Sequence, residues 1–181
     1  MRARKCLFVL LLTLLTLLFN TEVFGKEIQI TGSAEFQNQI HRALNLLRNK
    51  APDKYDTVLR YIGRIKESEK SAMWAYDDPP TFELAYQTAF YSITWCASSI
   101  AHDSFHSKLY HEYRDSKGPI PAVAWTGKAA EKKCLKYQVA TLKKIGAPKS
   151  EIDYCRKNKP TYSDRNNDGT YNWDDYKQIS W

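Results

Sequence analysis

Long apolar stretches, dense blocks of charge and sequence repeats are all scarce in this chain of 181 residues. Its one extended apolar run, residues 7–19, spans 13 residues. A membrane-spanning helix needs about 20 residues, so this run does not predict one. Internal repeats and low-complexity linkers are absent from the sequence, which favours one ordinary domain over a repeat architecture.

The chain also has no basic stripe of the kind that binds nucleic acid. The formal net charge is +7, but the 27 Lys and Arg residues are spread along the sequence and are not interleaved with aromatic residues. Nucleic-acid binding is therefore not expected. Glycines are scattered and aromatic residues make up 13% of the chain, which indicates a folded protein and not a disordered one.

The first 25 residues have the pattern of a secretory signal peptide. Three basic residues, Arg2, Arg4 and Lys5, precede the apolar run, which ends in a segment of the kind that signal peptidase cleaves. We expect a mature chain that starts at Lys26 and is secreted or periplasmic; an uncleaved signal anchor is the alternative. Removing the basic residues and Glu22 lowers the net charge from +7 to +5, which suits contact with anionic cell surfaces.

The mature chain is expected to be an α+β domain over residues 26–160 with a tail over residues 161–181. Apolar residues three and four apart predict a first helix, and Ser33 is placed to cap it. The other predicted elements are strands over residues 56–65, 72–76 and 81–85, helices over residues 87–113 and 126–145, and a short helix capped by Ser150.

The helix predicted over residues 87–113 carries two histidines, His102 and His106, four residues apart. Four residues are about one helical turn, so both imidazoles lie on one face and can share a metal ion. Asp103 places a carboxylate directly after the first histidine. This His-Asp-x-x-His frame indicates a metal site; two helix histidines without a metal are the alternative.

The frame resembles the His-Glu-x-x-His signature of zinc metallopeptidases, with Asp103 in place of the family's Glu. Glu131, in the next predicted helix, resembles the third ligand of gluzincins, whose site is His-His-Glu. The resemblance covers residues 81–148, and the phrases IAHDSFH and AAEKKCLKYQVATLKKIGAP are similar to small secreted bacterial proteins of the metallopeptidase class. Leu135 stands where gluzincins carry an Asp that supports a histidine, so that support must be built differently here.

This resemblance implies a compact zincin-like fold, mostly helical, with a small sheet next to the metal helix. It implies zinc held by His102, His106 and Glu131, with Asp103 as the catalytic base and a peptide or protein as the substrate. In such enzymes the strand before the metal helix often binds extended substrate by edge pairing, which here points to residues 81–85.

Further residues near the motif could act on the transition state. The phenol that such enzymes use for the oxyanion could come from Tyr110, Tyr113 or Tyr137, and the sequence does not choose among them. His111 is five residues after His106 and thus about 140° away around the helix, so it fits a hydrogen-bond donor near the site better than a ligand.

The predicted function is a secreted zinc-dependent peptidase. Asp is one methylene shorter than Glu, which shortens the reach of Asp103 to a water by about 1.5 Å. A misplacement of about 1 Å can cost about a hundredfold in rate. The alternative is therefore a catalytically weak or inactive zincin-like protein that binds a peptide or cell-wall ligand.

Three cysteines remain after removal of the leader, and their odd number leaves at least one unpaired within the chain. A bridge between Cys96 and Cys134 is favoured among the three pairings, because it would brace the two helices of the metal site. The alternatives are a pairing with Cys155 or three reduced cysteines.

The tail contains a segment that resembles a calcium-binding loop. Oxygen-bearing residues recur at the positions of an EF-hand loop, with Asp in place of the final Glu. These residues are Asp164, Asn166, Asp168, Thr170, Asn172 and Asp175. We expect a weak calcium site with a structural role; a polar turn without an ion is the alternative.

Overall fold

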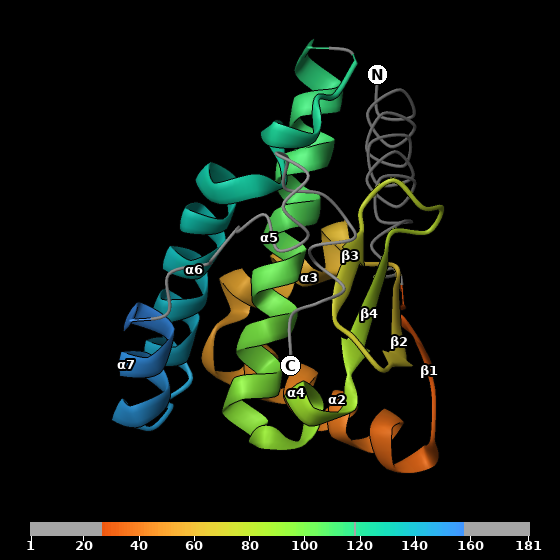
Figure 1. Cartoon of the computed structure of the whole chain (residues 1–181). Helices are drawn as coiled ribbons and strands as arrows, with labels where there is room; N and C mark the ends of the chain where they lie inside the picture. The colour runs from red at the N-terminus through yellow and green to blue at the C-terminus, as the bar shows by residue number, and fades with distance from the viewer. Residues whose placement is uncertain (1–26, 118, 158–181) are drawn as a thin grey trace, which may run out of the picture.

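A helix of 25 residues, α5 (Ile93–Lys117), runs through the middle of the fold and carries the His102–His106 pair. The computed structural model describes residues 27–117 and 119–157. Figure 1 shows α6 and α7 on one side of α5 and a small sheet on the other. The predicted fold class is confirmed: the protein is α+β and mostly helical, and the sheet contacts α5 through β3 and β4.

The remaining elements surround α5. The helices are α2 (Ala34–Lys50), α3 (Pro52–Tyr61), α4 (Tyr86–Tyr91), α6 (Gly127–Lys144) and α7 (Lys149–Lys157), with a 3-10 turn η1 (Ala122–Ala124) between α5 and α6. The strands are β1 (Gln29–Thr31), β2 (Arg64–Ser68), β3 (Ala72–Trp74) and β4 (Thr81–Ala85). Within the described residues, every helix is too short or too polar to cross a membrane.

The sheet has the strand order β1-β2-β4-β3, in which β3 alone is antiparallel to its neighbour. We expected β4, the strand that leads into the metal helix, to offer a free edge to substrate, and this expectation is wrong. β4 pairs with β2 on one side and with β3 on the other, so both of its backbone edges are used. The outer strand on the α5 side is β3.

The predicted strand over residues 56–65 is also wrong, because most of this stretch belongs to α3. Pro52 lies in the first turn of α3, where its missing N–H would have no helical partner anyway, and Asp53 adds favourable negative charge there. Strand β2 starts only at Arg64. Gly63 lies at the junction, and a Cβ on it would come within 2.4 Å of Cβ of Pro79, so the close approach requires glycine.

The first predicted helix is confirmed as α2, and it supplies one wall of the core. The Oγ of Ser33 accepts a hydrogen bond from the Phe36 N–H at 3.2 Å, which is the predicted N-cap. Its apolar stripe is buried and consists of Phe36, Ile40, Ala43, Leu44 and Leu47. This stripe packs in one cluster with the sheet residues Ile65 and Phe82 and with residues of α5.

The single helix predicted over residues 87–113 is divided at Ser92 into α4 and α5. Ser92 has an extended backbone, and its Oγ accepts a hydrogen bond from the Trp95 N–H at 2.9 Å. The buried carboxylate of Glu151, on α7, accepts hydrogen bonds of 2.7 Å from the hydroxyls of Ser92 and Thr94. The first turn of α5 is therefore held by α7 as well as by its own cap.

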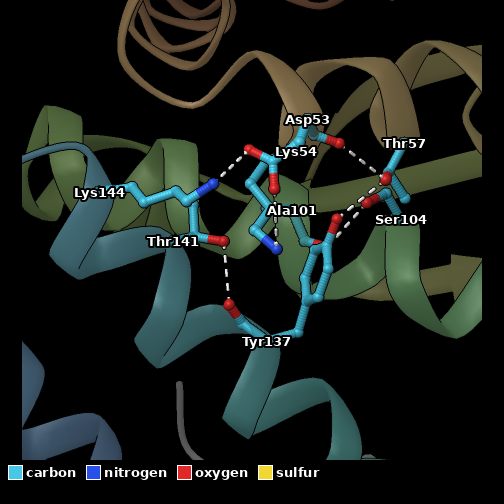
Figure 2. A network of polar contacts seen from close by, with 8 residues as sticks. All are labelled: Asp53, Lys54, Thr57, Ala101, Ser104, Tyr137, Thr141 and Lys144. Atoms are coloured by element: carbon cyan, nitrogen blue, oxygen red, sulfur yellow. Dashed lines mark hydrogen bonds and ion pairs between the residues drawn. The ribbon is translucent and has the colours of Figure 1, made fainter.

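A polar network holds α6 against α3 (Figure 2). The Tyr137 hydroxyl donates to Oγ1 of Thr57 at 2.9 Å, and Lys144 Nζ lies 2.8 Å from an Asp53 carboxylate oxygen. Lys54 Nζ lies 3.7 Å from the centre of the Tyr137 ring. Because α3 also packs on α5, these contacts help to set the position of α6 relative to the histidines.

The ends of α6 and α7 differ in detail from the predicted caps. Thr126 is the N-cap residue of α6, but its hydroxyl donates to the Ala122 carbonyl at 2.9 Å and accepts no capping hydrogen bond from the N–H groups of α6. The predicted stop at Gly146 is confirmed, and its φ of 75° is one that glycine adopts without strain. Helix α7 begins at Lys149, so Ser150 lies inside the helix and not at its cap.

Candidate metal centre

The histidines of α5 and one face of α6 meet where these two helices pack together. The Nε2 atoms of His102 and His106 are 3.1 Å apart. The Glu131 carboxylate contacts both, with Oε2 at 3.0 Å from His106 Nε2 and Oε1 at 3.4 Å from His102 Nε2. Two ring nitrogens and a carboxylate from neighbouring helices therefore converge on one point.

A thiol joins this group, although the sequence analysis gave it another role. The ligand atoms of His102, His106 and Cys134 all lie within 4.8 Å of one another, and together they could hold a metal ion. Cys134 follows Glu131 by three residues, so both lie on one face of α6. The sequence signal for this thiol is the Glu-x-x-Cys spacing, which was not among the predicted ligand patterns.

The bridge predicted between Cys96 and Cys134 is not formed. Cys96, Cys134 and Cys155 are all buried free thiols, although α5 and α6 do pack together. Burial raises the pKa of the Cys96 thiol to about 12 and also raises the pKa of Cys134. In the absence of a metal ion these thiols are therefore protonated at neutral pH.

The ring of His106 is oriented by a backbone carbonyl. Its Nδ1 lies 2.6 Å from the carbonyl oxygen of Trp125, in the turn that connects η1 to α6. A carbonyl oxygen only accepts hydrogen bonds, so Nδ1 carries the proton and Nε2 is left to face Glu131. This is the usual way in which proteins present Nε2 of a histidine to a metal. The contact is invisible to sequence reasoning, because any residue at position 125 supplies a carbonyl.

The charges at this point call for a cation. With Nδ1 of His106 protonated, a neutral imidazole would turn its Nε2 lone pair toward the ionised Glu131. Burial, the largest single influence, lowers the pKa of His102 and of His106, but attraction to Glu131 and Asp103 outweighs it and raises both. The same contacts hold the pKa of Glu131 far below its usual range, despite its burial. Either protons or a metal ion must supply the positive charge.

The spacing of the donors fits a metal ion. Zinc binds nitrogen and oxygen at about 2.0–2.1 Å, so two ligands at a tetrahedral angle stand about 3.3 Å apart. The separations of 3.0, 3.1 and 3.4 Å among His102, His106 and Glu131 are close to that value. The donor set of imidazole, carboxylate and thiol could hold a divalent transition-metal ion.

The carboxylate of Asp103, the predicted base, interacts electrostatically with His102, His106 and Glu131. Burial raises the pKa of its carboxyl, and the charge of Glu131 acts in the same direction. In the absence of a metal ion Asp103 is therefore a more basic carboxylate than usual.

A groove of about 560 Å³ lies between α5 and the η1 turn, and three of its seven lining residues are aromatic. Its lining residues are Tyr76, Tyr110, Arg114, Pro119, Ile120, Ala122 and Trp125. The Tyr110 and Trp125 rings pack edge to face with centroids 5.4 Å apart. The carbonyl of Trp125 accepts a hydrogen bond from His106, and Tyr110 is one helical turn after His106, so two of the lining residues adjoin this histidine.

The other predicted transition-state residues lie elsewhere. The Tyr137 hydroxyl is bonded to Thr57, and its ring stacks on Phe105 at 4.4 Å. Tyr113 is seven residues after His106, about 10 Å further along the helix axis. His111 packs between Tyr61 and Tyr110, at 6.1 and 5.2 Å, and burial lowers its pKa. Of these candidates, Tyr110 is the one that lines the groove.

Two predicted features lie outside the described residues. These are the leader over residues 1–25 and the calcium-loop segment, which spans residues 164–175.

No model of a known protein family matches the chain, and no curated protein or solved structure is significantly similar to it. The chemistry of the centre is therefore inferred from its geometry.

Proposed function

We propose that this protein is an exported zinc-dependent peptidase whose metal is held by His102, His106 and Glu131. One observation carries the proposal: two histidine nitrogens and a carboxylate converge with separations of 3.0–3.4 Å. Zinc hydrolases use two histidines and one glutamate as ligands. These three groups leave the fourth position of a tetrahedral zinc ion for water. The His-Asp-x-x-His frame and the downstream glutamate are similar to the gluzincin arrangement.

When bound, zinc lowers the pKa of a water molecule and polarises the carbonyl group under attack. Asp103 accepts the proton of that water and returns it to the leaving amine. Tyr110, which lines the groove, would donate a hydrogen bond to the developing oxyanion. The aromatic groove supplies a surface for apolar side chains of the peptide.

The first test combines zinc content with hydrolysis of casein or a library of quenched peptides. We expect about one zinc per wild-type chain, none in His102→Ala, and unchanged zinc in His41→Ala, which changes an exposed histidine of α2. Asp103→Asn should retain zinc and lose hydrolysis, because an amide keeps the shape of the side chain but cannot accept the proton. A wild-type protein without zinc would falsify the proposal.

A second function is favoured by the thiol beside the histidines. With Cys134 as a ligand in addition to Glu131, four protein groups would surround the metal, as in structural zinc sites. The protein would then be a zincin-like binding protein that holds a peptide or cell-wall ligand in the groove. Zinc-loaded wild type that cleaves nothing in the library, with Asp103→Glu equally inactive, would favour this function over the peptidase.

A further inference from the structure

Cys134 has no role in the peptidase chemistry described above, yet it is one of the buried groups nearest to it. Its side chain is 0% exposed, and its Sγ lies within 4.8 Å of the ligand nitrogens of both histidines. The other two described cysteines, Cys96 on α5 and Cys155 on α7, are equally buried but do not belong to this group. Burial alone therefore does not explain why one thiol faces the histidines.

We propose that Cys134 is a fourth metal ligand, which closes the site in the resting protein and competes with water for the position where hydrolysis occurs. This inference rests on the proposed function for the presence of a metal at His102, His106 and Glu131. It adds that the metal is held by four protein groups unless the thiolate is displaced. The site would thus be self-inhibited.

The geometry brings the thiol close to both histidines. Zinc–sulfur bonds are about 2.3 Å and zinc–nitrogen bonds about 2.0 Å, so S and N ligands at a tetrahedral angle stand about 3.5 Å apart. Sγ of Cys134 lies within 4.8 Å of the ligand nitrogens of both histidines, and rotation about its Cα–Cβ bond changes that separation. Glu131 lies three residues before Cys134 on the same helix, so both groups lie on one face of α6.

Charge is compatible with the closed form in this buried setting. His102 and Glu131 side chains are 12% and 16% exposed, so water screens the centre poorly. A divalent ion bound by one carboxylate and one thiolate is neutral, so the closed form leaves no uncompensated charge among its four ligands. With water in place of the thiolate, the second negative charge would come from Asp103, which interacts electrostatically with these ligands.

Cobalt substitution tests the proposal directly. Reduced, metal-free protein is titrated with Co²⁺, and the near-ultraviolet band of thiolate-to-cobalt charge transfer is recorded. We expect one equivalent of cobalt with this band in wild type, Cys96→Ser and Cys155→Ser. Cys134→Ser should bind cobalt without the band and about a hundredfold more weakly, at the upper end of what changes around a metal site cost.

A second measurement needs no variant and so does not depend on the folding of Cys134→Ser. The rate of alkylation of each cysteine by N-ethylmaleimide is followed by peptide mass spectrometry with and without zinc. Zinc should slow the reaction of Cys134 much more than that of Cys96 or Cys155. Equal protection of all three, or cobalt bound by wild type without the sulfur band, overturns the proposal.

Hydrolysis separates this inference from the peptidase proposal. At saturating zinc, Cys134→Ala should cleave peptides faster than wild type, because the position for water is no longer contested. A sulfur band with no hydrolysis in either protein leaves the fourth ligand intact and rejects the peptidase. Hydrolysis by wild type without a sulfur band supports the peptidase and rejects Cys134 as a ligand. A wild type that binds no metal rejects both the peptidase and the fourth ligand.

Discussion

At the scale of single residues, position 103 has the largest expected effect on the rate of hydrolysis. The carboxylate of Asp103 interacts electrostatically with His102, His106 and Glu131, yet it is one methylene shorter than the glutamate that such frames usually contain.

We expect Asp103→Glu to raise hydrolysis by up to about a hundredfold, because it restores the reach that the shorter side chain lacks. The measurement is kcat/KM on the best peptide from the library, with zinc content determined for both proteins. A fall in kcat/KM at equal zinc would mean that the spacing of α5 is already adjusted to aspartate.

At the scale of elements, hydrogen bonds to α7 hold the first turn of α5 in place. The Glu151 carboxylate of α7 is 5% exposed and accepts two hydrogen bonds of 2.7 Å from Ser92 and Thr94. Hydrogen bonds to a charged group contribute about 1.5–3 kcal/mol each, and a negative charge is favourable near a helix N-terminus.

We predict that Glu151→Ala lowers the free energy of unfolding by about 3 kcal/mol, because it leaves two partly buried hydroxyls without their charged acceptor. Glu151→Gln keeps one acceptor oxygen and should cost less than half as much. Urea unfolding followed by circular dichroism measures both. Equal losses for the two variants would show that packing, and not the hydrogen bonds, accounts for the effect.

The brace between α3 and α6 gives a contrasting prediction, because Tyr137 was a sequence candidate for the oxyanion. Tyr137→Phe removes the hydroxyl that donates to Thr57 but keeps the ring on Phe105. It should cost about 1 kcal/mol of stability. Tyr110→Phe, in the groove, should instead lower kcat with little effect on stability. Loss of kcat in Tyr137→Phe at normal zinc content would contradict this division of roles.

At the scale of the whole molecule, the histidine pair makes the stability of the metal-free protein depend on pH. The pKa values of His102 and His106 are raised above 6.5 in the fold, so their stabilisation is complete below pH 6.5 and is lost as the pH rises through the raised values. The pKa of Glu131 is lowered from 4.5, so its stabilisation is present above pH 4.5 and is lost in acid.

We therefore expect the metal-free protein to be most stable between pH 4.5 and 6.5 and to lose stability above that range. The pKa of Asp103 is raised, so its ionisation destabilises the fold as the pH rises. This reduces the stability that the ionisation of Glu131 adds in the acidic range. Zinc should reverse the trend, because protons and the metal compete for the same nitrogens. Urea unfolding from pH 4 to 9 measures this, and Glu131→Gln should flatten the metal-free profile.

Local patterns were enough to predict α2, α6 and the histidine pair, because helix caps and three-to-four spacing are properties of adjacent residues. The stretch that forms α3 was predicted as a strand. Over so few residues, the spacing of Val58, Tyr61 and the charged residues fits the helical period of 3.6 as well as the strand period of 2. The partners of β4 could not be read, because strand pairing is decided by distant segments. The same holds for the Trp125 carbonyl and the Cys134 thiol, whose roles exist only once α5 and α6 pack.

The position of the centre between two helices makes a bound metal a cross-link. His106 and Glu131 are 25 residues apart in sequence, so an ion that joins them closes a loop of that size. In the chain-entropy treatment of disulfides, a loop of about 25 residues restricts the unfolded chain by about 3.5 kcal/mol. The metal would thus give α5 and α6 the bracing that we first expected from Cys96 and Cys134. Unlike a disulfide, it would resist reductants and be opened by acid or a chelator.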